Sequence, residues 1–197
     1  MSAPVALPQI SYTAPGFDAA FMASLHEYGF AAVVDHPLDG DRVARIYGEW
    51  LAFFSSGEAA GFRMDPVKQD GYFSLREAEH AKGFVERDFK EYFQFYPWGR
   101  CPESLQVDLA SHFNAAVELG AELLNCIARS LPEAVTTELT EPLPDMIQDS
   151  EQSMLRVLHY PPVPVGRPVL RAAPHEDINL LTLLPAADGP GLELQLR

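Results

Sequence analysis

Cysteine is scarce in this chain of 197 residues, which contains only Cys101 and Cys126. The two residues lie far apart in the sequence and form no Cys-x-x-Cys pair, so neither a disulfide framework nor a zinc–thiolate site is expected. Long hydrophobic runs are also missing, since no stretch approaches the ~20 consecutive apolar residues that cross a bilayer. The start, Met1–Pro8, lacks the basic end and apolar run of a signal peptide. These absences predict a cytoplasmic protein.

Positive charge is scarce as well. The chain has 14 Lys and Arg against 28 Asp and Glu, which gives a formal net charge of −14. Such a surface repels the phosphates of nucleic acids and anionic membranes, so we expect neither as a partner. Hydrophobic residues, in contrast, make up 47% of the chain, and aromatic residues 11%. A disordered chain would not carry that load, and the length is sufficient for one domain with a hydrophobic core.

The first three quarters of the chain are predicted to be mostly helical. Apolar residues recur there at steps of three and four, which is the period of a helix that buries one face. In the segment 17–28 this stripe is followed by Gly29, at the position where a glycine often ends a helix. On the longest predicted helix, His112 is expected at the surface. The other predicted helices cover residues 40–54, 102–130 and a short stretch after Pro132.

The last quarter is predicted to be all β. Leu192, Leu194 and Leu196 alternate with polar residues, the period-two pattern of a half-buried strand. The chain is therefore predicted to be α+β, with a mostly helical region over 1–150 and a β domain over 151–197. A closed barrel or jelly roll needs about eight strands, so we expect the β domain to be incomplete in this chain. The predicted strands cover residues 30–34, 71–73, 88–96, 153–160, 169–184 and 191–196.

One short motif in the predicted β domain suggests metal chemistry. His175 and Asp177 are two positions apart, so on a strand both side chains point to the same side while Glu176 points away. An imidazole beside a carboxylate supplies two members of a 2-His-1-carboxylate triad, which suits iron(II) and leaves open coordination positions. The motif is common by chance, and an ordinary pair of polar surface residues is the alternative interpretation.

Other motifs extend this pattern over nearly the whole chain. The His-x-Asp is followed by Leu181-Thr-Leu-Leu184 and preceded, about fifteen residues earlier, by Tyr160-Pro161 at the end of a predicted strand. Together these segments resemble the isopenicillin-N-synthase-like family of non-haem iron(II)- and 2-oxoglutarate-dependent oxygenases. The N-terminal motifs that contribute to the resemblance are Gly29-Phe30, Asp35-His36, Gly71-Tyr72 and Asp88-Phe-Lys90-Glu91-Tyr-Phe93.

The resemblance implies a fold, a chemistry and a set of residues. A helical N-terminal region would pack on a double-stranded β-helix, the jelly roll. Iron(II), 2-oxoglutarate and O2 would together oxidise a small organic substrate, by hydroxylation, desaturation or ring closure. His175 and Asp177 would ligate the metal, and Tyr160 would help to hold the 2-oxoglutarate carboxylate, with core packing as the alternative. Arg156 shares a strand face with Tyr160 and is predicted either to bind a carboxylate or to form a salt bridge at the rim.

Other parts of the family pattern are missing. The second histidine ligand and the Arg-x-Ser that grips 2-oxoglutarate come later in the family, and the residues after Asp177 include neither. We therefore expect a fragment of a longer oxygenase, inactive by itself and monomeric when complete. A non-catalytic jelly-roll paralogue or binding module is the main alternative, and a zinc hydrolase is a weaker one. No catalytic residue beyond the metal ligands is predicted, Lys90 and Glu91 are predicted to be structural, and His159 is expected to point away from the cavity.

Overall fold

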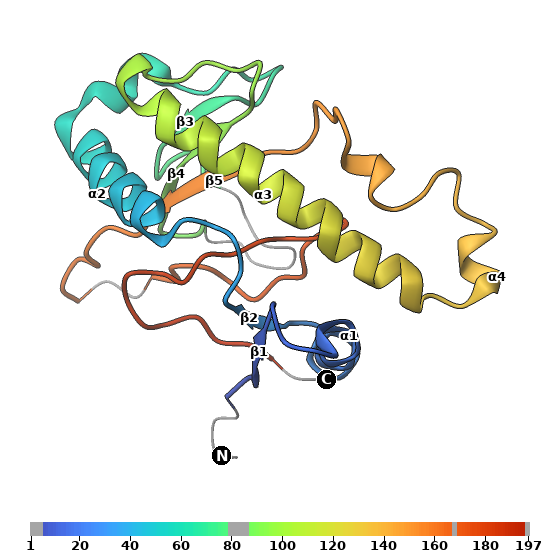
Figure 1. Cartoon of the computed structure of the whole chain (residues 1–197). Coiled ribbons are helices and arrows are strands. Elements are labelled where there is room, and N and C mark those ends of the chain that lie inside the picture. Colours follow the sequence, from blue (N-terminus) through green and yellow to red (C-terminus); the bar gives the residue numbers. More distant parts are fainter. Residues whose placement is uncertain (1–5, 79–86, 167–168, 196–197) are drawn as a thin grey trace. The chain divides into compact units, whose positions relative to one another are not determined.

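The structure, a computed structural model, describes residues 6–78, 87–166 and 169–195 (Figure 1). The chain forms two compact units. The first unit comprises Met1–Leu38, Ala115–Gln148 and Leu183–Arg197, and the second comprises Asp39–Asn114 and Asp149–Thr182. Helices and short strands are mixed in the chain, which confirms the predicted α+β class. None of the helices that the structure describes is long and apolar enough to cross a membrane.

The first unit contains a small parallel sheet and the helix α1. Strands β1 (Gln9–Ser11) and β2 (Ala32–Val34) pair in parallel, with Ile10 opposite Val33. Helix α1 (Phe17–Tyr28) connects them and ends as predicted at Gly29, whose φ of 73° suits glycine and whose N–H donates to the Leu25 carbonyl at 2.8 Å. The unit also holds the C-terminal part of α3 (Glu103–Ser130), α4 (Glu133–Thr136) and η2 (Asp145–Ile147).

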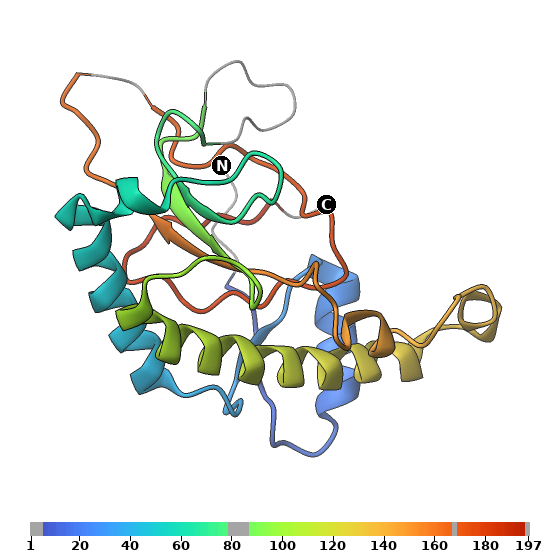
Figure 2. The same ribbon diagram turned by 90° about the horizontal axis from the view of Figure 1, so that it is seen from above.

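The second unit is built on a three-stranded antiparallel sheet. Its order is β3 (Gly71–Phe73), β4 (Glu91–Phe95) and β5 (Leu155–His159), with Phe93 opposite both Tyr72 and Val157. Figure 2 shows β4 in yellow-green beside β5 in orange. The strands predicted over 71–73, 88–96 and 153–160 are thus confirmed, the first with the same bounds and the other two with shorter ones. The same unit contains α2 (Gly40–Ser56), η1 (Glu58–Phe62) and the N-terminal part of α3.

One face of this sheet packs on aromatic side chains from α2, η1 and α3. Phe93 is fully buried, and its ring centroid lies 4.8 Å from that of Trp50 and 6.0 Å from that of Phe53. Phe95 makes an edge contact with Phe113 of α3 at 5.9 Å. The opposite face carries the alternate residues of β4, because successive strand side chains point to opposite sides. There Tyr92 stacks on Phe73 at 4.6 Å.

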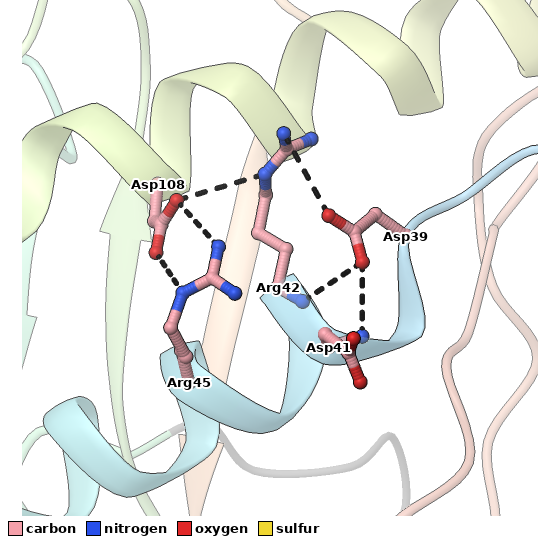
Figure 3. A network of polar contacts seen from close by, with 5 residues as sticks. All are labelled: Asp39, Asp41, Arg42, Arg45 and Asp108. Carbon is pink, nitrogen blue, oxygen red and sulfur yellow. Dashed lines mark hydrogen bonds and ion pairs between the residues drawn. The ribbon is translucent and has the colours of Figure 1, made fainter.

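Helices α2 and α3 are joined within this unit by a network of charged side chains (Figure 3). Asp39 caps α2, accepting hydrogen bonds from the backbone N–H groups of Asp41 and Arg42 at 3.0 and 3.2 Å. Arg45 donates to both oxygens of Asp108 on α3, from Nε at 2.8 Å and from Nη2 at 3.1 Å. This two-point geometry fixes the two helices more firmly than a pair of point charges would.

His112, on the same part of α3, does not lie at the surface as predicted. It is only 8% exposed, and its burial lowers the pKa of the imidazole, with Arg42 nearby as a second cause. The prediction followed the polarity of the residue. The structure buries it because neighbouring positions of α3, including Leu109 and Phe113, form part of the core of the unit.

The strands predicted over 169–184 and 191–196 are wrong for the residues that the structure describes. Residues 169–195 contain no helix or strand, and Leu192, one of the alternating leucines, is 72% exposed. A strand requires a neighbour that pairs with its backbone N–H and C=O groups. This segment finds backbone partners at isolated points, such as Leu170, whose carbonyl accepts from the N–H of Phe89 at 2.7 Å. Among the described residues of the predicted β domain, 151–166 and 169–195, β5 is the strand that forms.

Candidate metal and cosubstrate site

His175 and Asp177 lie close together although their segment is not a strand. Nε2 of His175 is 3.5 Å from Oδ1 of Asp177, and the two side chains are 51% and 50% exposed. Two ligand atoms at right angles on an octahedral ion with bonds of about 2.1 Å lie roughly 3 Å apart. The observed separation is therefore close to what two neighbouring ligands of one metal ion require, and both side chains are about half exposed.

The hydrogen bonds around the pair determine which atoms remain for a ligand. Nδ1 of His175 lies 2.8 Å from the carbonyl oxygen of Ala173. A carbonyl only accepts, so Nδ1 is the donor in this contact, and Nε2 is the ring nitrogen that is turned towards Asp177. Asp177 accepts at Oδ2 from the hydroxyl of Thr182 at 2.7 Å, which leaves Oδ1 facing His175. Such outer contacts commonly orient metal ligands in proteins.

Thr182 is in turn held by Asn179, whose Nδ2 donates to the Thr182 hydroxyl oxygen at 2.9 Å. Both residues belong to the segment that follows the His-x-Asp motif, so the carboxylate is oriented by its own local sequence. This role of Thr182 was not predicted from the sequence. The sequence does place a hydroxyl residue five positions after Asp177, but that hydroxyl can reach the Asp177 carboxylate only if the chain bends back between them.

Arg156 lies on the sheet face opposite the aromatic cluster of Trp50 and Phe53. It pairs across the strands with Gln94, and its Nη2 donates to Oε1 of Gln94 at 2.5 Å. Its guanidinium also lies over the ring of Tyr92, 4.6 Å from the centroid, in a cation–π contact. The predicted alternation along β5 is therefore observed, because Val157 is buried on the other face. These contacts hold the guanidinium against the sheet.

Tyr160 follows the last residue of β5 and is partly exposed. Its backbone carbonyl accepts from Nη1 of Arg171 at 3.4 Å, a long contact that links the end of β5 to the segment carrying His175. Both roles predicted for Tyr160, holding the 2-oxoglutarate carboxylate and core packing, stay predictions. The structure brings Tyr160 and Arg171 together, and Arg171 was not singled out by its sequence.

Glu91 and His159 lie on the helix-covered face of the sheet. Nδ1 of His159 is 2.7 Å from Oε1 of Glu91, the Tyr72 hydroxyl donates to Oε2, and the His159 ring stacks on Phe54 at 5.5 Å between centroids. Burial, together with the Glu91 carboxylate, raises the pKa of Tyr72 well above its usual range. His159 thus lies on the sheet face opposite Arg156, as the alternation along β5 requires, and the contacts of Glu91 agree with its predicted structural role. That His159 points away from the substrate cavity stays a prediction.

A complete metal site is not formed by the residues that the structure describes. Among them, no group of three or more His, Cys, Asp or Glu side chains could hold a metal ion. A cavity of about 360 Å³ exists elsewhere, between β1 and α1 of the first unit, and residues such as Ile10, Phe17 and Tyr28 line it. The cavity is lined mainly by apolar groups and includes neither His175 nor Asp177. The His175–Asp177 pair is therefore the stronger candidate for a metal site.

The chain is similar to several known proteins, although no protein-family model matches it. It is 28% identical over 213 residues to the 2-oxoglutarate-dependent dioxygenase ucsF of Acremonium sp, covering 90% of this chain and 60% of that protein. A crystal structure described as an oxygenase from Shewanella oneidensis shares 40% identity at a TM-score of 0.79, over 89% of this chain and 64% of that one.

A second solved structure, described as a 2OG-Fe(II) oxygenase family protein from Caulobacter crescentus, is similar in fold. It shares 24% identity at a TM-score of 0.61, over 81% of this chain and 57% of that one. The chain therefore spans about 60% of the length of the relatives that it matches.

Proposed function

Because the chain belongs to the superfamily of iron(II)- and 2-oxoglutarate-dependent oxygenases, we propose that the whole protein is a dioxygenase that oxidises a small organic substrate with O2. The observation that carries the proposal is the pairing of His175 Nε2 with Asp177 Oδ1 at 3.5 Å. Both side chains are about half exposed, and each is oriented by a hydrogen bond on its other side.

The donor atoms present fit iron(II). A neutral imidazole nitrogen and a carboxylate oxygen are two of the three protein ligands in a facial triad, and the arrangement leaves positions for a chelating cosubstrate and O2. We propose that His175 and Asp177 hold the ion, which supplies the oxidising chemistry when bound. The chain's own contribution is to fix the tautomer of His175 through Ala173 and the rotation of the Asp177 carboxylate through Thr182.

Arg156 and Tyr160 are the proposed contacts of 2-oxoglutarate. Arg156 lies on the sheet face opposite the aromatic cluster, against Gln94 and Tyr92, and its planar guanidinium is of the kind that suits a carboxylate. Tyr160 is tied through Arg171 to the segment that carries the metal ligands. We also propose that residues 151–197 open a jelly-roll domain, of which β5 is a strand, and that the complete protein is a cytoplasmic monomer.

The proposal is tested by O2 uptake in the complete protein, supplied with iron(II) and 2-oxoglutarate. Uptake that requires both, and that is lost in His175→Ala and in Asp177→Ala, supports the assignment. His36→Ala is the matched control, since it replaces an exposed histidine that is not among the proposed ligands, and it should leave uptake unchanged. Retained uptake in His175→Ala would show that the ligand assignment is wrong.

The same experiment separates the alternative functions. A non-catalytic jelly-roll binding module would take up no O2 under any metal condition. A zinc hydrolase would work with a redox-inert metal and without O2. The similarity to dioxygenases and the nitrogen–oxygen ligand pair favour the first function over both of these.

A further inference from the structure

We propose that Asp88, supported by Lys90, is a positioning residue for the metal ligand His175. It would act by fixing the backbone of Ala173, and the proposal rests on the proposed function of His175. The Oδ1 atom of Asp88 accepts a hydrogen bond from the N–H of Ala173 at 2.9 Å, although the two residues are 85 positions apart in sequence. No part of the metal chemistry assigned above uses Asp88 or Lys90.

The Asp88 carboxylate is buried and fully engaged. Its side chain is 4% exposed, and its Oδ2 atom forms an ion pair at 2.8 Å with Nζ of Lys90, whose side chain is 7% exposed. Burying a charge is costly unless it is paired and hydrogen-bonded, so each member of the pair depends on the other. Lys90 therefore holds the carboxylate in the orientation that presents Oδ1 to Ala173.

Ala173 transmits this position directly to His175. It is 2% exposed, its N–H donates to Asp88, and its carbonyl accepts from Nδ1 of His175 at 2.8 Å. The backbone N–H of Ala173 is thus hydrogen-bonded to the buried carboxylate, and its C=O to the imidazole. The sequence of contacts runs from Lys90 through Asp88 and Ala173 to the ring whose Nε2 faces Asp177.

The hydrogen bond from Ala173 to Asp88 is important because residues 169–195, which carry His175, form no strand pairing that would fix their backbone. Leu170, Ile178 and Leu180 are 41%, 100% and 48% exposed, so packing does little to locate the backbone around them. The N–H of Phe89 donates to the carbonyl of Leu170 at 2.7 Å, which gives a second attachment beside Asp88. Residues 88 and 89 thus attach the segment at Leu170 and Ala173, just before His175.

Three variants test this role in the full protein. Asp88→Ala removes the acceptor, Lys90→Met removes its support, and the double variant Asp88→Asn with Lys90→Met restores a neutral acceptor for Ala173 without a buried charge. The matched control is Asp108→Asn, which breaks another carboxylate contact of the same unit, between α2 and α3. The first readout is hydrogen exchange of the Ala173 amide in metal-free protein, and the second is Mn(II) affinity by calorimetry.

Asp88→Ala is expected to speed exchange of the Ala173 amide at least ~10-fold and to weaken Mn(II) binding by about 10- to 100-fold, the range typical of lost outer contacts. Lys90→Met should act in the same direction. The double variant should recover both properties to within roughly threefold of wild type, which a purely charge-dependent structural role would not produce. Asp108→Asn should change neither. If Asp88→Ala fails to fold, Lys90→Met and the double variant decide the matter.

Unchanged exchange of the Ala173 amide in the Asp88 or Lys90 variants would overturn the proposal, and so would normal Mn(II) affinity alongside accelerated exchange.

Failure of the proposed metal-binding function of His175 would give different results. Wild-type protein would then bind no Mn(II), or bind it equally well after His175→Ala, and the Ala173 exchange data alone would decide whether Asp88 is the tether.

Discussion

The hydroxyl of Thr182 donates a hydrogen bond of 2.7 Å to Oδ2 of Asp177, and this bond decides which carboxylate oxygen faces His175. Thr182→Val keeps the shape of the side chain and removes the donor. We expect Mn(II) affinity to fall by about 10-fold, since outer contacts of this kind are worth 10- to 100-fold. Thr136→Val in α4 is the matched control and should bind as wild type does. Equal affinity in both variants would mean that Asp177 needs no such support.

The thiol of Cys126 is expected to resist alkylation in the folded protein. Burial, and secondarily the hydrogen bond that the thiol donates to Asp18 at 3.1 Å, raises the pKa of Cys126 to about 11. At about pH 8 the reactive thiolate is therefore rare. Iodoacetamide should label Cys126 only after unfolding, as followed by mass spectrometry. Asp18→Asn should speed labelling of the folded protein, and rapid labelling of the wild type would contradict the prediction.

The Arg45–Asp108 contact predicts a pH-dependent contribution to stability. The hydrogen bond from Arg45 holds the pKa of Asp108 below its ordinary value of 3.8. A carboxyl whose pKa is lowered by folding stabilises the fold above the unfolded pKa and loses that contribution as the pH falls through the folded pKa. The destabilisation caused by Arg45→Gln, measured by urea unfolding, should therefore be largest above 3.8 and shrink below it.

In an Asp108→Asn background, the same Arg45→Gln change should show no such pH dependence. A pH-dependent effect that persists there would assign the titration to another carboxyl group. Asp39, which is 3.9 Å from Arg42, is the nearest alternative in the network of Figure 3.

Gly71 is expected to be irreplaceable at the start of β3. Its φ is 101°, and a Cβ there would lie 2.5 Å from the carbonyl oxygen of Phe62. Gly71→Ala should lower the free energy of unfolding by more than about 1 kcal/mol, because the strain and the clash act together. Gly61→Ala is the control, since a Cβ there meets no atom within 4 Å. Equal denaturation midpoints for the two variants would contradict the prediction.

Phe93 is expected to be the most sensitive position of the sheet. It is fully buried and contacts the rings of Trp50, Phe53 and Phe62. Phe93→Ala should destabilise the protein by about 3–5 kcal/mol, the range for truncating a large aromatic residue in a core. Val107→Ala, at a position 74% exposed, should cost less than about 0.5 kcal/mol. Urea denaturation of both variants measures the difference.

The helices were predictable because their signals are local. Helix α1 has the bounds that its apolar stripe and Gly29 indicate, and α2 and α3 differ from their predicted bounds by one or two residues at an end. The His175–Asp177 pair was also found from the sequence, but for an incomplete reason. The prediction placed both residues on a strand, whereas the structure brings them together through Ala173 and Thr182.

The sequence by itself determined the helices, the His-x-Asp motif proposed to supply two metal ligands, and the acidic, cysteine-poor character of the chain, because these depend on residue types and short spacings. The tertiary structure alone decided that residues 169–195 pair with no strand among the described residues, that His112 is buried, and that Asp88 reaches Ala173. Strand pairing and contacts such as the Asp88–Ala173 hydrogen bond join residues far apart in the chain, so no local pattern contains them.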